Sequence, residues 1–375
     1  MVEQDIKLQC KILPFNKVFL SMRVHFKIKC PPKRQSKNIN ININWDLMNK
    51  NYPLIFGIGN PLVDVVIQAS ESDLINLELN KGTMELVDEN RQKEIISYFK
   101  GKHPLYFPGG SAPNTILACA GLGINSHIAG RIGNDKLGDI YIDRVNEYGA
   151  DSGLVRGGGR TGSSIILVTP DGERTMNTNL GACQDYSSVD IDKEKLARAK
   201  FFYFTGYMWD TDSQKSAIKI AIQIAQENNV KIVFDVADPF AVSRNKDSFI
   251  EMIKQDIDIV FANKSELNIL FDSEDIEFCV DNLGKVVDNF GIKLGKEGSL
   301  IINGSNRHMI HPSPVSAKDS TGAGDMYAAG FLTSLAKGKG YYDSGRIAVQ
   351  LAEEVIRVNG AQLDKEVILN LAEKI

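Results

Sequence analysis

The feature that most constrains the fold is a regular alternation of apolar strands and helices in the second half of the chain. Mainly apolar, strand-like runs at residues 201–204, 231–236, 257–262, 292–294 and 299–303 alternate with helical segments. The helical segments cover residues 213–227, 246–255, 265–271, 276–290, 324–336, 344–358 and 365–372. Strands that are apolar on both faces predict a parallel sheet that helices cover on both sides. The expected fold class is therefore α/β, with three layers around a mostly parallel central sheet.

The section before this alternation has shorter strands and a hairpin signal. Pro170-Asp171-Gly172-Glu173 separates two strand-like runs, as the turn of a hairpin does. We expect these strands to form a small β lid, from about residues 65–108 and 152–182. The lid would be inserted into a single domain that spans residues 52–375.

Residues 1–51 differ in composition from the rest. Ten Lys or Arg stand against three Asp or Glu in the first 50 residues, and residues 38–44 alternate between Asn and Ile. A basic, low-complexity segment of this kind predicts a disordered extension outside the domain. A targeting segment is a second interpretation, and upstream sequence before a translation start at Met48 is a third. The sequence leaves the choice open.

The overall composition excludes several classes of function. The net charge of −4 gives no support for nucleic-acid binding, and no segment approaches the ~20 apolar residues of a membrane span. The five cysteines are scattered without C-x-x-C spacing, and the five histidines lack the spacing of metal ligands. We therefore expect a cytoplasmic protein with reduced thiols and a small-molecule substrate, without a nucleic-acid or membrane partner.

A glycine-rich turn precedes the helix predicted at residues 324–336. Gly322, Ala323 and Gly324 place backbone N–H groups at the helix N-terminus, where the helix dipole favours an anion. Asp325 follows directly. A carboxylate beside an anion site is unfavourable unless it has a role. Taking a proton from a hydroxyl, while the N–H groups stabilise charge on a phosphoryl group, is such a role. A plain glycine-rich turn with an ordinary aspartate is the alternative.

Asn263 and Glu266 form a second candidate element. They stand at the end of an apolar strand where a helix begins, and the carboxyl ends of parallel strands are where ligands bind. An amide and a carboxylate three residues apart suit hydrated Mg²⁺, which keeps its waters and uses few carboxylates. The same pair is also a capping box. Both interpretations stay open.

Two further elements lie in the first half of the chain. Gly109 and Gly110 precede a small-residue helix and predict a hinge or a close backbone approach, with Asn114 placed to bond a substrate hydroxyl. Asn60 and Asp64 follow the first strand. Asp64 stands in an apolar run, so its carboxylate needs partners. Two vicinal sugar hydroxyls and the N–H groups of a structural turn fit equally well.

The standard glycine motifs for nucleotides do not match. Gly57-Ile58-Gly59 lacks the third glycine of a dinucleotide fingerprint, and residues 291–296 lack the spacing of a P-loop. A protein of this sequence that handles ATP does so without a Walker motif.

Three segments together resemble the signatures of the ribokinase-like (PfkB) kinases of carbohydrates and nucleosides. They are residues 109–114, 130–138 and 319–325. The resemblance runs from about Leu54 to Gly360, and the Asn-Pro pair that begins at Asn60 is most similar to the adenosine-kinase branch. It implies a PfkB kinase domain at residues 52–375. The implied reaction transfers a phosphoryl group from ATP, with Mg²⁺, to a primary hydroxyl, most simply converting adenosine to AMP.

The resemblance also implies a role for each candidate residue. Catalysis falls to Asp325 as the base, with Gly322, Ala323 and Gly324 as the anion hole. Substrate binding falls to Asp64 at the ribose hydroxyls, with Asn114, Gly109 and Gly110 beside it and Asn60 near the base. The nucleotide and its magnesium fall to Asn263 and to Glu266 (acting through water), with Gly295, Gly298 and Asn359 at the nucleotide edge. Asn359 would also lie near a potassium site.

Departures from the family pattern leave the substrate open. Ala112-Pro113 replaces the Thr-Gln that is frequent in animal-type adenosine kinases, so the base is not fixed. One alternative is a sugar kinase of the same family, acting on ribose, fructose or a keto-acid sugar. Another is a non-catalytic nucleoside-binding protein, against which the intact Asp325 argues. The sequence leaves open a monomer or a homodimer, and the use of K⁺.

Overall fold

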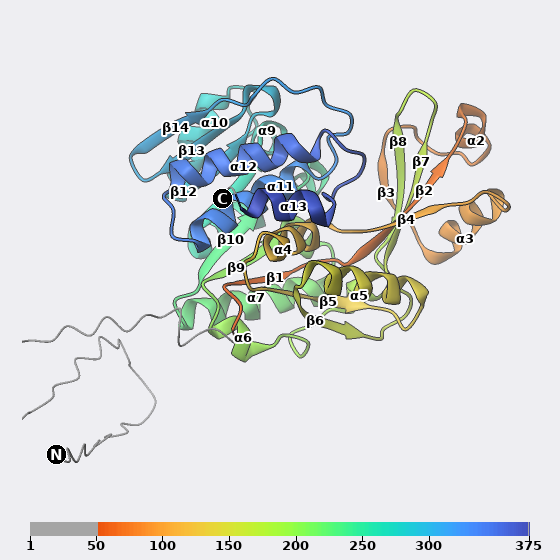
Figure 1. Ribbon diagram of the computed structural model, residues 1–375, viewed down its shortest axis with the longest axis horizontal. Coiled ribbons are helices and arrows are strands. Elements are labelled where there is room, and N and C mark those ends of the chain that lie inside the picture. The colour runs from red at the N-terminus through yellow and green to blue at the C-terminus, as the bar shows by residue number, and fades with distance from the viewer. Residues whose placement is uncertain (1–51, 374) are drawn as a thin grey trace, which may run out of the picture. The chain divides into compact units, whose positions relative to one another are not determined.

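The structure is a computed structural model that describes residues 52–373 and 375. The predicted N-terminal extension, residues 1–51, lies outside the described residues. The described chain contains a nine-stranded sheet and a five-stranded sheet (Figure 1). Among the described residues, no helix combines the length and the apolar character needed to cross a bilayer.

The nine-stranded sheet is the frame of the fold. Its strands, in spatial order, are β14 (Asn306–Ile310), β13 (Ser299–Asn303), β12 (Asn289–Lys293), β11 (Ile259–Asn263), β10 (Lys231–Asp235), β9 (Phe201–Thr205), β1 (Ile55–Ile58), β5 (Ser126–Ile132) and β6 (Asp151–Arg156). All neighbours from β12 to β6 pair in parallel, whereas β13 and β14 pair antiparallel at the edge. The prediction of a mostly parallel α/β sheet is confirmed.

Side-chain alternation along the central strands explains the three layers. On β9, Phe202 and Phe204 point into one hydrophobic core, while Phe201 and Tyr203 point into the other. The first core is covered by α6 (Lys193–Ala197), α7 (Asp212–Glu227), α8 (Pro239–Asp256), α9 (Lys264–Phe271) and α10 (Ile276–Leu283). The second is covered by α4 (Ser111–Gly121), α5 (Lys136–Tyr148), α11 (Ala323–Ala336), α12 (Tyr341–Val355) and α13 (Lys365–Ala372).

Several expected elements differ from the structure; for example, the helix expected at residues 246–255 begins earlier, at Pro239. The helix expected at residues 276–290 ends at Leu283, because Gly284 follows and the next apolar run joins the sheet as β12. Strand β14 was not expected; it returns along β13 through a turn at Gly304. Residues 152–156, expected in the lid, belong to β6 and pair with β5 in the large sheet.

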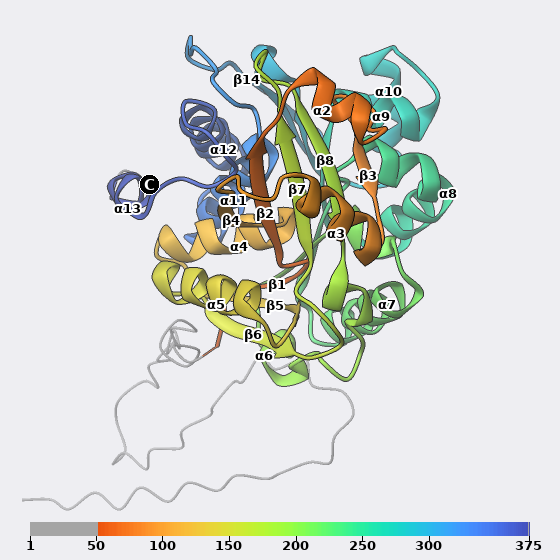
Figure 2. The ribbon, with the colours of Figure 1, turned by 90° about the vertical axis from the view of Figure 1, so that its right-hand side faces the viewer.

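The five-stranded sheet is a separate layer, which we call the lid. Its order is β3 (Met84–Leu86), β8 (Arg174–Asn179), β7 (Ser163–Val168), β2 (Leu62–Gln68) and β4 (Leu105–Gly109). Helices α2 (Glu71–Asn76) and α3 (Glu89–Tyr98) cover one face, over a small core that includes Ile67, Ile95 and Leu167 (Figure 2). The other face carries Asp64, which alternates with the buried Val63 and Val65.

The chain enters the lid after β1 and leaves it before α4, and Gly110 lies at this exit. Gly110 has a φ of +96°, and a Cβ there would lie 2.0 Å from the carbonyl oxygen of Asn60. The connection from β1 to the lid and the connection from the lid to α4 are therefore packed against each other, and only glycine fits at position 110.

We expect Gly110→Ala to lower the free energy of unfolding by more than about 2 kcal/mol, because it combines a strained φ with a backbone clash. Gly123→Ala is the matched control: Gly123 also has a positive φ, of +85°, but nothing lies within 4 Å of its missing Cβ. Urea unfolding followed by circular dichroism measures both. Equal losses in the two variants would contradict the clash.

Candidate active site

Asp325 lies in the first turn of α11, directly after the glycine-rich turn. Gly322 caps this helix with a φ of +78°, and a Cβ there would lie 2.5 Å from the Cα of Ala361. The Ser111 hydroxyl donates a hydrogen bond of 2.6 Å to Asp325 Oδ1, and Asn114 Nδ2 donates one of 2.8 Å to Oδ2. Both donors come from the N-terminal turn of α4. The structure therefore brings together Asn114 and Asp325, which lie in separate sequence motifs, whereas Asn114 was predicted to lie at a substrate hydroxyl beside Asp64.

The environment of Asp325 makes it a stronger base than an exposed carboxylate. Burial raises the pKa of Asp325 to about 7, against the opposing effect of the hydrogen bonds from Ser111 and Asn114. A general base works best when its pKa lies near the operating pH. The geometry thus provides a carboxylate that can accept a proton near neutrality.

The anion site predicted at Gly322, Ala323 and Gly324, which we call the cradle, has only some of its N–H groups free to bind a ligand. The N–H group of Ala323 points to the carbonyl oxygen of Ser320 at 3.3 Å. Those of Gly322 and Gly324 have no acceptor within the described part of the chain. The Lys293 ammonium lies close by, because a Cβ on Gly324 would be 3.3 Å from Lys293 Nζ. Free N–H groups beside a cation suit a phosphate oxygen.

Lys293 belongs to a buried charged cluster at the carboxyl ends of β10, β11 and β12. Its ammonium lies 2.9 Å from both carboxylate oxygens of Asp235, which is almost fully buried. Burial acts to lower the pKa of Lys293, but Asp235 and Glu266 outweigh it and hold that pKa above its ordinary value. Lys293 therefore stays cationic beside the cradle.

Asn263 and Glu266 form the capping box of α9. Glu266 is fully buried, and its two carboxylate oxygens accept hydrogen bonds from the backbone N–H and the side-chain amide of Asn263. Burial raises the pKa of Glu266 to about 7. Residues 52–373 contain no group of three or more His, Cys, Asp or Glu placed to hold a metal directly. Buried carboxylates with occupied oxygens fit Mg²⁺ only through its water shell, so this role stays a prediction.

The lid contributes a carboxylate and a cation on the face opposite α2 and α3. Asp64 pairs with Ser164 in the sheet register, and Arg174 pairs with Val168 four residues further along β7, so both side chains lie on that face. Arg174 Nη1 donates to Asp319 Oδ2 at 2.8 Å and to Thr321 Oγ1 at 2.9 Å. This contact ties the lid to the turn that carries the cradle.

The Asp64 carboxylate has no hydrogen-bond or ion-pair partner among the described residues, although it is only partly exposed. Burial raises the pKa of Asp64 to about 6, and Arg174 opposes this rise. A structural turn, the alternative raised by the sequence, would have given it N–H partners. The free carboxylate is available to a ligand.

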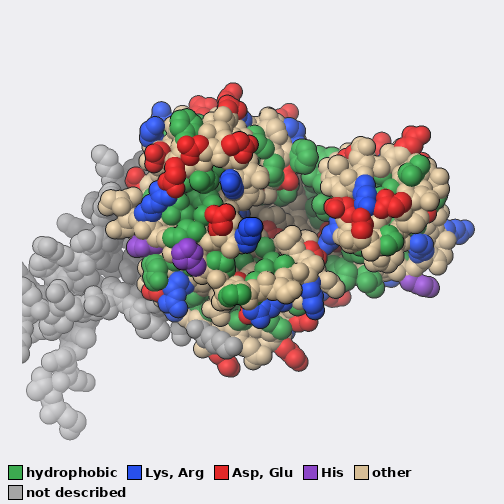
Figure 3. All heavy atoms as spheres, turned by 90° about the horizontal axis from the view of Figure 1, so that it is seen from above, with side chains coloured by type: hydrophobic (Ala, Val, Ile, Leu, Met, Phe, Trp, Pro, Cys, Tyr) green, Lys and Arg blue, Asp and Glu red, His purple; other side chains and the backbone are tan. Residues whose placement is uncertain are grey.

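The other predicted substrate residues support this region. Asn60 is buried, and its side-chain oxygen accepts a 2.6 Å hydrogen bond from Gln214 Nε2, so it holds the start of the lid to α7. The Gly109 carbonyl accepts a bond of 2.7 Å from the Tyr141 hydroxyl. Seen from above, the surface is hollowed where the lid meets the large sheet (Figure 3).

A cavity of about 810 Å³ adjoins the cradle, and none of the residues that line it belongs to the lid. Gly295 and Gly298 line it together with Lys293, Ala323 and Gly324, so the structure brings these predicted nucleotide residues together. Asn359 is exposed and does not line this cavity. Its predicted role at the nucleotide edge and at a potassium site gains no support from the geometry.

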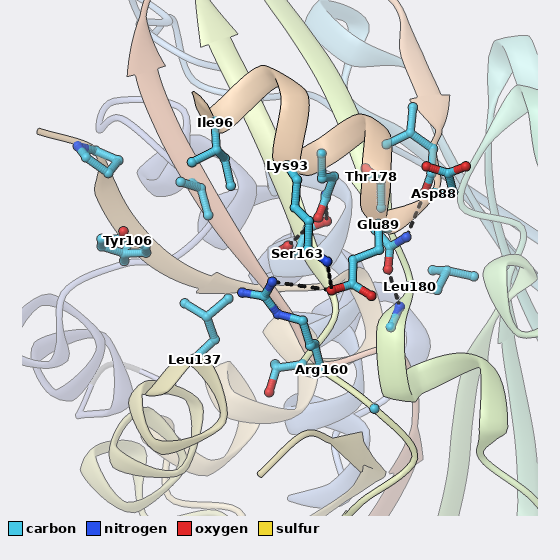
Figure 4. A pocket seen from close by; sticks show the side chains of 18 of the residues that line it. Asp88, Glu89, Lys93, Ile96, Tyr106, Leu137, Arg160, Ser163, Thr178 and Leu180 are labelled. Atoms are coloured by element: carbon cyan, nitrogen blue, oxygen red, sulfur yellow. Dashed lines mark hydrogen bonds and ion pairs between the residues drawn. The ribbon is translucent and has the colours of Figure 1, made fainter. Parts of the chain in front are cut away.

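A larger cavity, of about 1200 Å³, lies on the outer side of the lid between α3, α5 and residues 158–161. Figure 4 shows Lys93 and Arg160 both directed at Glu89 in this cavity. None of the predicted site residues lines it. Its size alone therefore does not make it the active site.

Several site residues were missed by sequence reasoning. Ser111 lies within the segment 109–114 and was not predicted as a site residue, although its hydroxyl next to Gly110 was a usable signal. Lys293 ends an apolar strand beside the predicted nucleotide glycines, and Asp235 ends another. Arg174 follows the hairpin turn of the lid. For Lys293 and Asp235, the position of a charged residue at the carboxyl end of a strand was the available signal.

We expect Asp325→Asn to raise the melting temperature relative to the wild type at pH 8, and to raise it less at pH 5. In the wild type, the pKa of Asp325 rises from 3.8 to about 7 on folding. The folded state therefore holds the extra proton between these values, and the free energy of unfolding falls as the pH rises through this window. The substitution removes this loss.

Asp319→Asn is the control of opposite sign. Burial tends to raise the pKa of Asp319, but hydrogen bonds from Thr321 and the Gly360 N–H outweigh it and lower the pKa below its ordinary value. This variant should be less stable than the wild type at pH 8. Thermal unfolding by scanning calorimetry checks both. A pH-independent difference for Asp325→Asn would contradict the raised pKa.

Comparison with known proteins identifies the family. Residues 84–368 match the pfkB family carbohydrate kinases. The adenosine kinase of Schizosaccharomyces pombe is 26% identical over 333 residues, which cover 83% of this chain and 96% of that protein.

Solved structures give the same answer. The adenosine kinase of Sinorhizobium meliloti superposes with a TM-score of 0.79 at 32% identity, covering 86% of this chain and 99% of that one. A probable sugar kinase from Rhizobium etli gives the same TM-score at 30% identity, covering 86% and 98%. The predicted ribokinase-like, adenosine-kinase-like assignment is confirmed, and the chain belongs to the pfkB family of carbohydrate kinases.

Proposed function

We propose that this protein transfers a phosphoryl group from ATP to a primary hydroxyl of a nucleoside, with adenosine as the substrate and AMP as the product. The observation that carries the proposal is the free, partly buried carboxylate of Asp64. It lies on the same lid face as Arg174, which contacts the turn leading to Asp325. A carboxylate that accepts from two vicinal hydroxyls would place the remaining hydroxyl of a ribose toward the second carboxylate.

The lid face around Asp64 supports a nucleoside over a free sugar. Cross-strand register places Phe107 directly opposite Asp64, and Phe107 is 43% exposed. Apolar side chains on the same face are Val66, Leu105, Ile166 and Met176. A free sugar presents hydroxyls on most of its edges, whereas a nucleobase has apolar faces that cover such a surface.

The proposed step uses the residues of this chain as follows. Asp325 accepts the proton of the substrate hydroxyl, whose oxygen forms a bond to the γ-phosphorus of ATP. The bond to the bridging β–γ oxygen breaks, and ADP leaves. The free N–H groups of Gly322 and Gly324, with Lys293, stabilise the charge on the transferred group. Mg²⁺, when bound, would neutralise phosphate charge, with Glu266 and Asn263 holding its waters.

Arg174 adds a link between lid and chemistry. Its Nε is buried without a partner among the described residues, while its Nη1 holds Asp319 and Thr321. An anion that enters between the lid and the cradle can complete this hydrogen-bonding set. Closure of the lid would then exclude water from the reacting groups.

The direct test is ADP release with MgATP and adenosine, inosine, guanosine, ribose and fructose as acceptors. We expect turnover with adenosine, and a loss of at least about 100-fold in Asp325→Asn, because an amide cannot accept the proton. Turnover on a free sugar alone would favour a sugar kinase, as the Rhizobium etli neighbour's name suggests. Near-normal turnover of Asp325→Asn would rule out Asp325 as the base.

We expect Asp64→Ala to raise KM for adenosine about 10- to 100-fold and to leave KM for ATP within about twofold. The substitution leaves two ribose hydroxyls without their charged acceptor, while the nucleotide cavity is unchanged. Steady-state kinetics with each substrate varied measures both constants.

Asp171→Ala is the matched control, since Asp171 is an exposed lid carboxylate in the hairpin turn, paired with Lys81. It should leave both constants unchanged. Equal increases in the two KM values for Asp64→Ala would show that Asp64 acts on the lid as a whole and not on the acceptor.

A further inference from the structure

The cavity beside the cradle contains a carboxylate that the proposed reaction does not use. Most of the wall away from the cradle is apolar, with Pro314, Val315, Val349 and Ile356. Glu353 lies among them, on α12, and is only 8% exposed. Carboxylate oxygens that lie largely out of reach of water usually have hydrogen-bond partners.

Only one oxygen of Glu353 is occupied in the described structure. Oε1 accepts a hydrogen bond from the backbone N–H of Ser313, in the segment that follows β14. Oε2 has no hydrogen-bond or ion-pair partner among the described residues. Glu353 thus lines the cavity with one carboxylate oxygen that can accept a hydrogen bond from an N–H or O–H group.

The position of Glu353 within the cavity indicates which part of a ligand it would meet. Ala323, Gly324 and Lys293 line the cradle end. Glu353, with Ser313 and Val349, also lines a neighbouring cavity of about 380 Å³ that the cradle residues do not reach. Glu353 therefore lies at the end remote from the phosphate-binding groups. A nucleotide with its phosphates at the cradle would direct its base to this end.

We propose that Glu353 recognises the base of the phosphoryl donor by accepting a hydrogen bond from the 6-amino group of adenine. The inference rests on the proposed function, because it takes the cavity as the donor site. The apolar walls accommodate a planar purine, and the single free carboxylate oxygen supplies one directional contact. A carboxylate only accepts hydrogen bonds, so it favours an amino group over a group that cannot donate.

The test is calorimetric binding of ADP and of purine riboside 5′-diphosphate, which carries hydrogen in place of the amino group. No acceptor is added, so the readout does not depend on turnover. The wild type should bind ADP at least about tenfold more tightly than the analogue, because the analogue leaves the carboxylate unpaired. Glu353→Gln can keep the bond to Ser313 through its amide oxygen, which turns its NH₂ group to the base. Its preference for ADP should fall to within about twofold.

Glu354→Gln is the matched control, because the neighbouring glutamate on α12 does not line the cavity. It should keep the wild-type preference. Equal weakening of both nucleotides in Glu353→Gln would overturn the inference, since it would show that Glu353 only positions the segment at Ser313. Tight binding of both nucleotides to the wild type without discrimination would overturn it as well. Absence of any nucleotide binding would instead overturn the proposed function.

Discussion

The contact between Asp325 and the first turn of α4 is the interaction on which the rest of the site depends. Ser111 and Asn114 stand more than 200 residues before Asp325 in the chain. Their hydrogen bonds fix the carboxylate at the N-terminus of α11. Ser111 directly follows Gly110, where the chain leaves the lid, and Asn114 lies in the same helical turn. The orientation of the carboxylate is thus linked to the path of the lid strand through one short, rigid connection.

The charges around this contact are unevenly balanced. Lys293 contacts Asp235, and its charge also lowers the pKa of Glu266 and of Asp325. Within the described residues, burial raises the pKa of all three carboxyl groups, and Lys293 opposes the rise in each. The pKa values of Glu266 and Asp325, about 7 in each case, leave both carboxyl groups partly protonated near neutral pH. Lys293 therefore does not face three full negative charges.

Much of this arrangement could be predicted from the sequence. Apolar strand runs such as residues 201–204 predicted the parallel sheet, because a strand buried on both faces leaves a continuous apolar pattern. The motifs around Asp325 and Asn114 predicted that both residues belong to one site, because glycine-rich turns before helices and the ends of strands are where ligands bind. These signals are short-range, and they are read directly from the residues.

What could not be predicted depends on pairing across the fold. The ion pair of Arg174 with Asp319 joins residues 145 positions apart, and no local pattern specifies such a partner. The antiparallel pairing of β14 with β13, and the pairing of residues 152–156 with β5 in the large sheet, likewise depend on strands that the local pattern does not specify. The capping box of Asn263 and Glu266 was visible in the sequence. The full burial of Glu266, which makes any metal contact of its carboxylate indirect, was not.

The route of the chain through the lid limits how the lid could acquire a new specificity. The lid is built from two separate stretches, β2 to β4 and β7 to β8, and β5, α5 and β6 of the body lie between them in sequence. Strand β7 pairs with β2, so each stretch completes the sheet of the other. A lid of new specificity cannot be acquired by exchanging one continuous cassette. Asp64 lies in the first stretch and Arg174 in the second, so residues of both stretches would have to change together for this face of the lid to acquire a new specificity.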